Sequence, residues 1–244
     1  MCEQLAGLPF ERIAAVDGRS VDGPERREPI RPLGYEHLTR YERACILSHR
    51  KAWSRFLESG ERLACVLEDD VTLSPSFGDF VLDESWFPAD GRIIKLETYD
   101  QPVVLSRRTI PCRGRTFAPL RTKHLGTAAY VVNRAAAVFY LKETIRPDLP
   151  LDYFIFGNSA VKTHSPVYQL SPALSIQAKR LPGGIAFPEL ASSIESEAPK
   201  VRKPFLLKIK NEVRRPFLHL GEFLWSIASG SRFLERRCPR VDFA

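Results

Sequence analysis

Residues 63–70 read Leu-Ala-Cys-Val-Leu-Glu-Asp-Asp, a short apolar run that ends in three consecutive acidic residues. A run of this length between turn signals is typical of a strand that is buried on both faces. Two similar runs follow at residues 92–96 and 128–132. We therefore expect three buried strands, the first of which carries the acidic triplet at its carboxyl end.

Segments with a helical spacing of apolar residues flank these runs, at residues 38–59 and 133–145. Thr39, or a residue just before it, is expected to cap the first helix, and Gly60 is expected to end it. Strands that alternate with helices predict an α/β fold of the Rossmann type, with a mixed, mainly parallel sheet flanked by helices. Residues 9–16 are predicted to add a short strand.

The basic charge of the chain is confined to its C-terminal part. The 244 residues carry a net charge of +7, and residues 199–244 hold eleven Lys and Arg against four Asp and Glu. Residues 1–198 are therefore neutral, which argues against a main domain that binds nucleic acid. We predict a globular domain over residues 1–198 and a basic C-terminal tail over residues 199–244 that meets an anionic surface.

The tail mixes its basic residues with Phe, Leu and Trp over residues 203–227. This mixture favours a helix at the interface of an anionic membrane, and a helix packed on the domain is the alternative. The chain has no uncharged apolar run long enough to span a bilayer, and its first ten residues do not read as a signal peptide. We expect a cytoplasmic protein that is peripheral at the inner face of the membrane. The five cysteines form no CxxC pair and are expected to be reduced thiols.

The acidic triplet is a candidate metal site. In open α/β sheets, ligands bind beyond the carboxyl ends of the strands, where Glu68, Asp69 and Asp70 are expected to lie. Three adjacent carboxylates repel one another, and a divalent cation bridging to a diphosphate relieves that repulsion. Mn²⁺ and Mg²⁺ prefer carboxylate and phosphate oxygens. The alternative is a solvated turn whose acids pair with nearby Arg side chains.

The segments around this triplet resemble glycosyltransferase family 25, which includes bacterial lipooligosaccharide galactosyltransferases and procollagen galactosyltransferases. The resemblance is carried first by Cys45-Ile46-Leu47-Ser48-His49 with Trp53, and then by residues 66–71. Further matching pieces occur in the same order, at Ala15-Val16-Asp17-Gly18, Lys95-Leu96-Glu97-Thr98, Gly126-Thr127-Ala128-Ala129-Tyr130, Pro150-Leu151-Asp152, Pro172-Ala173-Leu174 with Gln177, and Ser193-Ile194. The resemblance covers residues 9–196.

The resemblance implies a GT-A-type fold, a UDP-sugar donor (usually UDP-galactose), a divalent metal and transfer with inversion. By the match to the family's DxD-type motif, Asp70 and Glu68 are metal ligands, and Asp69 contacts the ribose or a sugar hydroxyl. Family members normally begin with a strand and an Arg-bearing turn ahead of the segment matched by residues 9–18. We therefore expect the domain to lack that first strand.

Inverting transfer needs a base that takes the proton of the acceptor hydroxyl. Asp152 is the first candidate, although an Asp before an apolar run is also a common helix N-cap. Glu97 is the second candidate, with a buried ion pair to Lys95 or an Arg as the alternative.

Three further residues are candidates for the sugar-nucleotide pocket. His49 shares a helix face with Trp53 and either lines that pocket or packs in the core as a hydrogen-bonded pair. Gly126 and Thr127 are predicted to let the backbone approach the donor or the acceptor.

The expected function is transfer of a hexose, galactose first of all, from a UDP-sugar to a lipooligosaccharide or another cell-envelope glycan. Two alternatives stay open at this stage. One is an inactive relic that binds a sugar nucleotide or a glycan, and the other is a metal-dependent phosphoesterase.

Overall fold

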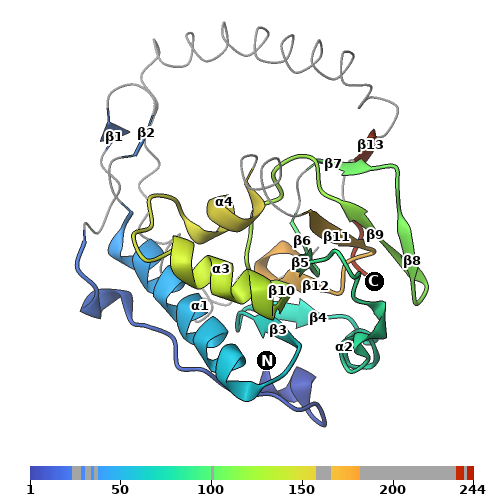
Figure 1. Cartoon of the computed structure of the whole chain (residues 1–244), viewed down its shortest axis with the longest axis horizontal. Helices are drawn as coiled ribbons and strands as arrows, with labels where there is room; N and C mark the ends of the chain where they lie inside the picture. Colours follow the sequence, from blue (N-terminus) through green and yellow to red (C-terminus); the bar gives the residue numbers. More distant parts are fainter. Residues whose placement is uncertain are drawn as a thin grey trace, which may run out of the picture.

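A computed structural model of the chain describes residues 1–23, 29–30, 34–35, 38–99, 102–157, 166–181, 235–238 and 241–244. Helices lie on both faces of a central sheet, and a smaller sheet continues from one end of it (Figure 1). The described helices are α1 (Arg40–Ser59), α2 (Phe77–Val81), α3 (Arg134–Glu143) and α4 (Leu151–Phe156). The described strands are β1 (Pro29–Ile30), β2 (Gly34–Tyr35), β3 (Leu63–Leu67), β4 (Val71–Leu73), β5 (Ile93–Lys95), β6 (Glu97–Thr98), β7 (Val103–Ser106), β8 (Ile110–Cys112), β9 (Arg115–Pro119), β10 (Ala129–Asn133), β11 (Val167–Ser171), β12 (Ser175–Gln177) and β13 (Glu235–Cys238).

The central sheet has the order β3-β10-β5-β11-β9-β8 and is mostly antiparallel. Within its described strands, β5 and β11 form the one parallel pair, whereas β10 runs antiparallel to both β3 and β5. The predicted α/β class is right, but the mainly parallel sheet is wrong. An apolar run indicates only that both faces of a strand are buried. In this protein most of the strands are buried without the crossover connections that parallel strands require.

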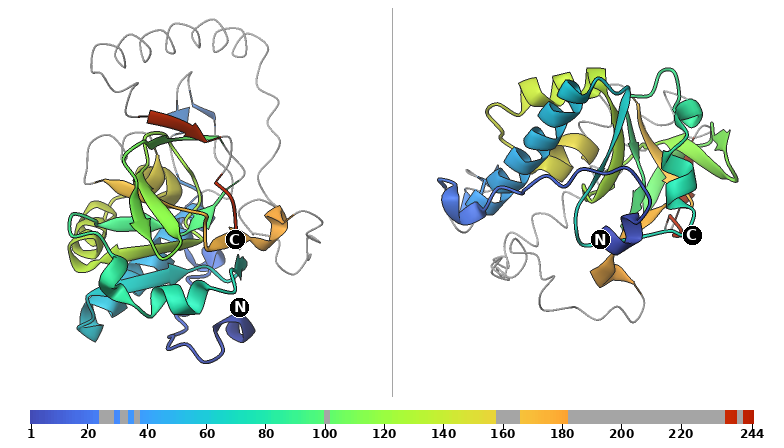
Figure 2. Two further views of the ribbon diagram at one scale, coloured as in Figure 1. Left: turned by 90° about the vertical axis from the view of Figure 1, so that its right-hand side faces the viewer. Right: turned by 90° about the horizontal axis from the view of Figure 1, so that it is seen from below.

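Two apolar layers cover the sheet. Alternate residues of β10 point to opposite faces, with Tyr130 and Val132 in one cluster and Ala129 and Val131 in the other. The first cluster packs under α1, α3 and α4, and the second packs under α2 and the N-terminal residues. Two perpendicular views show α1, α3 and α4 on one side of the sheet and α2 on the other (Figure 2). The predicted buried strands at 92–96 and 128–132 are confirmed as β5 and β10.

Strand β3 is only partly buried, contrary to the expectation for residues 63–67. It lies at the edge of the central sheet, with β10 as its one neighbour there. The carboxyl end of β3 nevertheless carries the acidic triplet, as the sequence indicated, and β4 follows at once.

Helix α1 begins and ends where the sequence predicts. Thr39 and Glu42 form a capping box, in which the Thr39 hydroxyl accepts from the Glu42 N–H and the Glu42 carboxylate accepts from the Thr39 N–H. Gly60 ends the helix in the left-handed conformation, at φ +80°. The predicted helix at 133–145 is confirmed as α3, with Asn133 as its cap.

Residues 9–16 form no strand, so that prediction is wrong. The segment runs along α1, where the Val16 N–H donates to Ser48 and Glu11 pairs with Arg55. The segment has the residue pattern of a strand, but its neighbour is a helix. The backbone groups inside a helix already bond one another, so they cannot pair with a strand.

The described end of the C-terminal tail is attached to the domain. Strand β13 pairs antiparallel with β7, and Val241 is 1% exposed in the core. The Val241 carbonyl accepts a hydrogen bond from the Thr98 hydroxyl, and the Asp242 carbonyl accepts from the Ala173 N–H. The predicted boundary at 198/199 and the basic segment 203–227 lie outside the described residues.

Within the described residues, no helix combines the length and the apolar character that crossing a bilayer requires.

A buried histidine ties the central sheet to the smaller one. The Gln169 amide nitrogen donates to the Leu170 and Glu97 carbonyls, so its oxygen faces His124 Nδ1 at 2.7 Å and accepts from it. His124 Nε2 then accepts from the Tyr99 N–H at 3.1 Å. This arrangement needs a neutral ring, and burial together with the nearby Lys95 charge lowers the pKa of His124 to about 4.

This histidine predicts how the stability of the protein depends on pH. The folded state keeps His124 neutral down to about pH 4, whereas the unfolded chain protonates it near 6.5. The unfolded state therefore binds more protons between these values, and the free energy of unfolding falls as the pH falls, by on the order of 3 kcal/mol. Urea unfolding at pH 7, 6, 5 and 4 measures this fall. The variant His124→Gln should have a shallower slope than the parent, and equal slopes would contradict the assignment.

Candidate functional site

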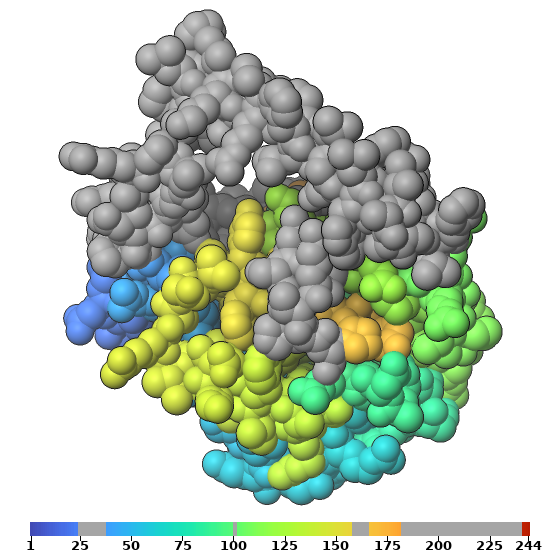
Figure 3. All heavy atoms as spheres, turned by 45° about the horizontal axis from the view of Figure 1, so that its top comes forward, coloured from blue at the N-terminus to red at the C-terminus, as the bar shows by residue number. Residues whose placement is uncertain are grey.

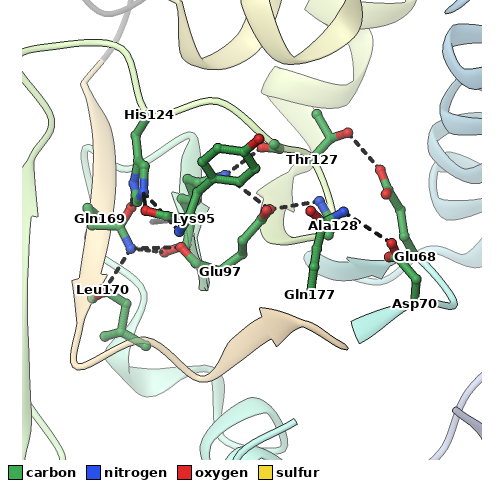
Figure 4. Close-up of polar contacts among 12 residues, drawn as sticks. Glu68, Asp70, Lys95, Glu97, His124, Thr127, Ala128, Gln169, Leu170 and Gln177 are labelled. Carbon is green, nitrogen blue, oxygen red and sulfur yellow. Dashed lines mark hydrogen bonds and ion pairs between the residues drawn. The ribbon is translucent and has the colours of Figure 1, made fainter. Parts of the chain in front are cut away.

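The residues singled out in the sequence converge where β3, β5, β10 and β12 end or begin. Glu68 follows β3, Glu97 begins β6 directly after β5, and Gly126 and Thr127 precede β10. The smaller sheet, ordered β4-β12-β6, brings Gln177 at the end of β12 beside the acidic triplet. Figure 4 shows Glu97 in the middle of this group, with the pairs Thr127–Glu68 and Gln177–Asp70 to one side.

The segment 126–128 is the hub of these contacts. The Thr127 hydroxyl donates to Glu68 Oε1 at 2.7 Å, and the Ala128 N–H donates to Glu97 Oε2 at 2.8 Å. Gly126 has φ +97°, and a Cβ built on it would lie 2.2 Å from Glu97 Oε1. Only glycine permits this approach. The backbone here approaches Glu97, and the predicted approach of Gly126 and Thr127 to a donor or an acceptor stays a prediction.

Lys95 and Glu97 form a fully buried ion pair, with Nζ and Oε2 3.0 Å apart. As residues i and i+2 of an extended segment they point to the same side, and Lys95 also donates to the Gly126 carbonyl. Burial raises the pKa of Glu97 and lowers the pKa of Lys95. The ion pair that the sequence left open as an alternative is thus formed, and the role of Glu97 as a base stays a prediction.

A chain of buried aromatic groups fixes the proton on His49. Trp53 Nε1 donates to the Tyr130 hydroxyl oxygen at 2.9 Å, so the Tyr130 proton is directed to His49 Nδ1, 2.8 Å away. His49 then carries its own proton on Nε2, which lies 3.3 Å from Glu68 Oε1. His49 and Trp53 are both buried and bonded to Tyr130, as in the core-facing alternative, and the predicted place of His49 in the sugar-nucleotide pocket stays a prediction. His49 reaches the site by donating to Glu68.

Glu68 is held in its ionised form. Burial by itself raises the pKa of its carboxyl group, but hydrogen bonds from His49 and Thr127 and the charge of Lys95 outweigh that effect. The net result is a lowered pKa. A carboxylate held in this way keeps its charge available to a cation.

A second grouping around Glu68 has ligand atoms within 4.8 Å of one another, and it consists of Cys45, His49 and Glu68. Burial and the neighbouring Glu68 charge raise the pKa of the Cys45 thiol far above its usual range. A neutral thiol is a poor metal ligand, since metals bind the thiolate. Both His49 nitrogens also have protein partners. These contacts explain the grouping as packing around Glu68.

Asp70 has the feature expected of a metal ligand. Its Oδ2 accepts from Gln177 at 3.2 Å, whereas its Oδ1 is buried and has no hydrogen-bond partner in the described part of the chain. Burial raises the pKa of Asp70, the charges of Glu68 and Asp69 add to this rise, and Lys179 opposes it. An unpartnered buried carboxylate oxygen beside two more acids fits a hard divalent cation. Asp69 itself is exposed.

Asp152 lies in the first turn of α4 and not at its N-cap, which is Pro150. Burial raises its pKa, and the N–H groups of Tyr153 and Gly126 partly oppose that rise by donating to the carboxylate. The Gly126 contact ties Asp152 to the same hub as Glu97 and Thr127. Helix α4 and the segment 166–181 lie on the same face of the molecule (Figure 3).

Sequence reasoning gave no role to three polar residues of this region. Gln177 stood in a matched segment, but its bond to Asp70 depends on the pairing of β12 with β4. Lys179 and Arg180 follow directly, in a 3-10 turn, and had no motif to mark them. The available signal was their position just after a short buried strand, which is where ligand-binding residues of α/β proteins occur.

Comparison with known proteins shows which family the chain belongs to. The sequence profile of glycosyltransferase family 25, described as an LPS biosynthesis protein family, matches residues 1–155. The chain is 33% identical to the lacto-N-neotetraose biosynthesis glycosyltransferase LgtB of Neisseria gonorrhoeae over 180 residues, which is 70% of this chain and 62% of the relative.

Two further relatives agree with this. LgtB of Neisseria meningitidis serogroup A is 34% identical over 71% of this chain and 66% of its own length. The lipooligosaccharide biosynthesis protein lex-1 of Haemophilus influenzae is 32% identical over 70% of this chain and 61% of its own length. The chain thus spans less than two thirds of the length of these relatives. With the profile matching more than half of its residues, the chain belongs to glycosyltransferase family 25.

Proposed function

We propose that this protein is a glycosyltransferase that moves a hexose from a UDP-sugar to a lipooligosaccharide or another cell-envelope glycan. The observation that carries the proposal is the buried Asp70 Oδ1, which has no hydrogen-bond partner among the described residues, close to Glu68 at a strand end in a family 25 domain. The names of the relatives support a glycan of the cell envelope as the acceptor. Galactose as the sugar, inversion at the anomeric carbon and a GT-A-type fold are parts of the same proposal.

Glu68 and Asp70 are the residues that would hold a divalent cation, Mn²⁺ first and Mg²⁺ as the alternative. A cation bound there supplies Lewis-acid stabilisation of the charge on the departing diphosphate. Two features support this assignment. Hydrogen bonds from His49 and Thr127 lower the pKa of Glu68, and no group in the described part of the chain competes for Asp70 Oδ1. Asp69 is exposed beside them, and it is proposed to contact the ribose or a sugar hydroxyl.

In an inverting transfer, the acceptor oxygen forms its bond to the anomeric carbon as the bond from that carbon to the diphosphate oxygen breaks. The electron pair of the broken bond stays on the diphosphate, and the acceptor proton passes to a base. Asp152 is proposed as this base, since burial raises its pKa and so strengthens it as a proton acceptor. Glu97 is the second candidate, and its ion pair with Lys95 suits it better to positioning the 126–128 segment.

We also propose that the basic segment 203–227 holds the protein at the inner, cytoplasmic face of an anionic membrane, where lipid-linked acceptors are found. Support comes from the sequence, where the whole excess of positive charge lies beyond residue 198 among Phe, Leu and Trp.

The proposed activity is tested by titrating the full chain with a panel of UDP-sugars and Mn²⁺, with mass spectrometry of the products. Binding with transfer to a lipooligosaccharide acceptor is the expected result. Binding without transfer would support an inactive sugar-nucleotide-binding relic. Phosphate release from simple esters, without sugar binding, would support a phosphoesterase.

Substitution Asp70→Asn should weaken Mn²⁺-dependent UDP binding roughly 10- to 100-fold, a loss that even outer-shell partners of metal sites cause. The amide keeps the shape of the side chain but removes the anionic oxygen. Calorimetric titration with UDP, with and without Mn²⁺, measures the loss. Asp79→Asn is the matched control, because Asp79 is an exposed carboxylate on α2. Parent-like affinity in the Asp70 variant would remove Asp70 from the metal site.

Substitution Asp152→Asn should lower kcat by roughly 10²-fold or more, because an amide cannot take the acceptor proton. UDP affinity should stay near that of the parent, since Asp152 is not assigned to the diphosphate. The control is Asp148→Asn, an exposed acid just before α4. Near-normal turnover in the Asp152 variant would exclude the base role and direct attention to Glu97.

Replacing Lys208, Lys210, Arg214 and Arg215 together by Gln should reduce binding to anionic vesicles. Each basic residue near such a surface contributes about 1 kcal/mol, so the loss should reach roughly 100-fold or more at low salt. Sedimentation with anionic and neutral vesicles measures it. Transfer to a soluble acceptor fragment should persist. Unchanged sedimentation of the variant with anionic vesicles would refute attachment through this segment.

A further inference from the structure

Two basic residues stand directly after the residue that contacts Asp70. Gln177 ends β12, and a 3-10 turn over Ala178–Arg180 follows. The Ala178 N–H donates to the Asp70 carbonyl at 2.8 Å, which fixes the start of this turn against the acidic triplet. Strand β12 lies between β4 and β6, so Lys179 and Arg180 leave the small sheet between Asp70 on one side and Tyr99 on the other.

Arg180 is held in one orientation. Its guanidinium carbon lies 3.6 Å from the centre of the Tyr99 ring, and its Nη2 donates to the Tyr99 hydroxyl. Tyr99 is itself held by His124, which accepts from the Tyr99 N–H. Stacking of this kind covers one face of the guanidinium and leaves the in-plane donors that do not bond Tyr99 to bind another group.

Arg180 has unused donor capacity in the part of the chain that the structure describes. Its Nε is buried there without a hydrogen-bond partner, and no carboxylate of the described residues forms an ion pair with its guanidinium. A buried N–H of this kind is costly unless a ligand satisfies it. Positive charge with planar donors recognises a phosphate group.

Lys179 adds a second positive charge to the same place. Lys179 directly follows Ala178, whose N–H donates to the Asp70 carbonyl, so it lies one residue beyond a backbone contact with the acidic triplet. The acidic triplet and the two basic residues therefore form an edge with both signs of charge. A diphosphate with a cation on one side needs positive charge on the other as well, and this need grows as the bond to the sugar breaks.

We infer that Arg180, with Lys179 beside it, binds the diphosphate of the sugar nucleotide opposite the acidic triplet. This inference rests on the proposed function, because it assumes a nucleoside-diphosphate donor at Glu68 and Asp70. The breaking bond leaves its electron pair on the β-phosphate oxygen, and Arg180 faces the charge that develops there. Tyr99 acts as a positioning residue because it holds the guanidinium, and His124 positions Tyr99 in turn.

The test compares UDP with uridine as ligands of the full chain, by calorimetry or ligand-observed NMR in the presence of Mn²⁺. The two ligands share the base and the ribose and differ in the diphosphate. The variant Arg180→Gln should bind UDP roughly 10- to 100-fold more weakly, the effect of losing charge-assisted hydrogen bonds. Its affinity for uridine should not change. Lys179→Gln should show a smaller loss of the same kind.

Two controls separate this role from a structural one. Arg62→Gln removes an exposed positive charge that precedes β3, at the end of that strand opposite Glu68, and should leave both affinities unchanged. Arg180→Lys keeps the charge and should recover part of the UDP affinity. Its thermal unfolding, measured beside that of Arg180→Gln, shows whether the fold is retained.

The outcomes distinguish this inference from the function on which it rests. If the parent binds UDP and Arg180→Gln binds it equally well, the inference fails and the proposed function stands. A parallel loss of UDP and uridine affinity would show that Arg180 only supports the fold, which also overturns the inference. If the parent itself binds neither UDP nor a UDP-sugar, the proposed function fails, and the inference fails with it.

Discussion

The buried ion pair between Lys95 and Glu97 fixes the geometry on which the candidate site depends. Such a pair adds little net stability, but removing one partner strands a charge in the interior and costs about 3–5 kcal/mol. Lys95 binds the Gly126 carbonyl and Glu97 binds the Ala128 N–H, so both ends of the 126–128 segment are tied to the pair. The Thr127 hydroxyl between them is thereby aimed at Glu68. Glu68, the first residue of the acidic triplet, is thus positioned from the interior of the sheet.

The surroundings of the carboxyl groups in the site shift their pKa values in opposite directions. Glu68 receives hydrogen bonds from His49 and Thr127 and has a lowered pKa, whereas burial raises the pKa of Asp70 and of Asp152. Groups whose pKa values are pushed apart in one site can take different roles. The lowered pKa of Glu68 suits the cation-binding role proposed for it, and the raised pKa of Asp152 suits the proposed role as a base. The difference follows from hydrogen bonding at Glu68 and from burial at Asp152.

The sequence was sufficient to predict elements that depend on neighbouring residues in the chain, such as helix caps. It was insufficient to predict features that depend on how distant strands pair. Helix α1 was predicted because Thr39, Gly60 and the apolar spacing between them are local signals. The direction of β10 was not, because burial on both faces is the same for parallel and antiparallel neighbours. For the same reason the bond from Gln177 to Asp70 could not be foreseen, since it requires β12 to pair with β4 across more than 100 residues. The ion pair of Lys95 with Glu97 was foreseeable, because residues two apart in a strand share a side.

The C-terminal tail contacts the domain close to the candidate site, which its composition does not indicate. Its last residues return to the domain, where Val241 is buried and its carbonyl binds the Thr98 hydroxyl, one residue after Glu97. The last described residues before the basic segment, 178–181, lie beside Tyr99 and Asp70. The described residues that precede and follow the basic segment both contact β6 or the residue directly after it, through Arg180 on Tyr99 and through Val241 with Thr98. Removing the tail as a whole would also remove Val241 from the core. The proposed membrane attachment can therefore be tested separately from the fold only by changing charges within the basic segment.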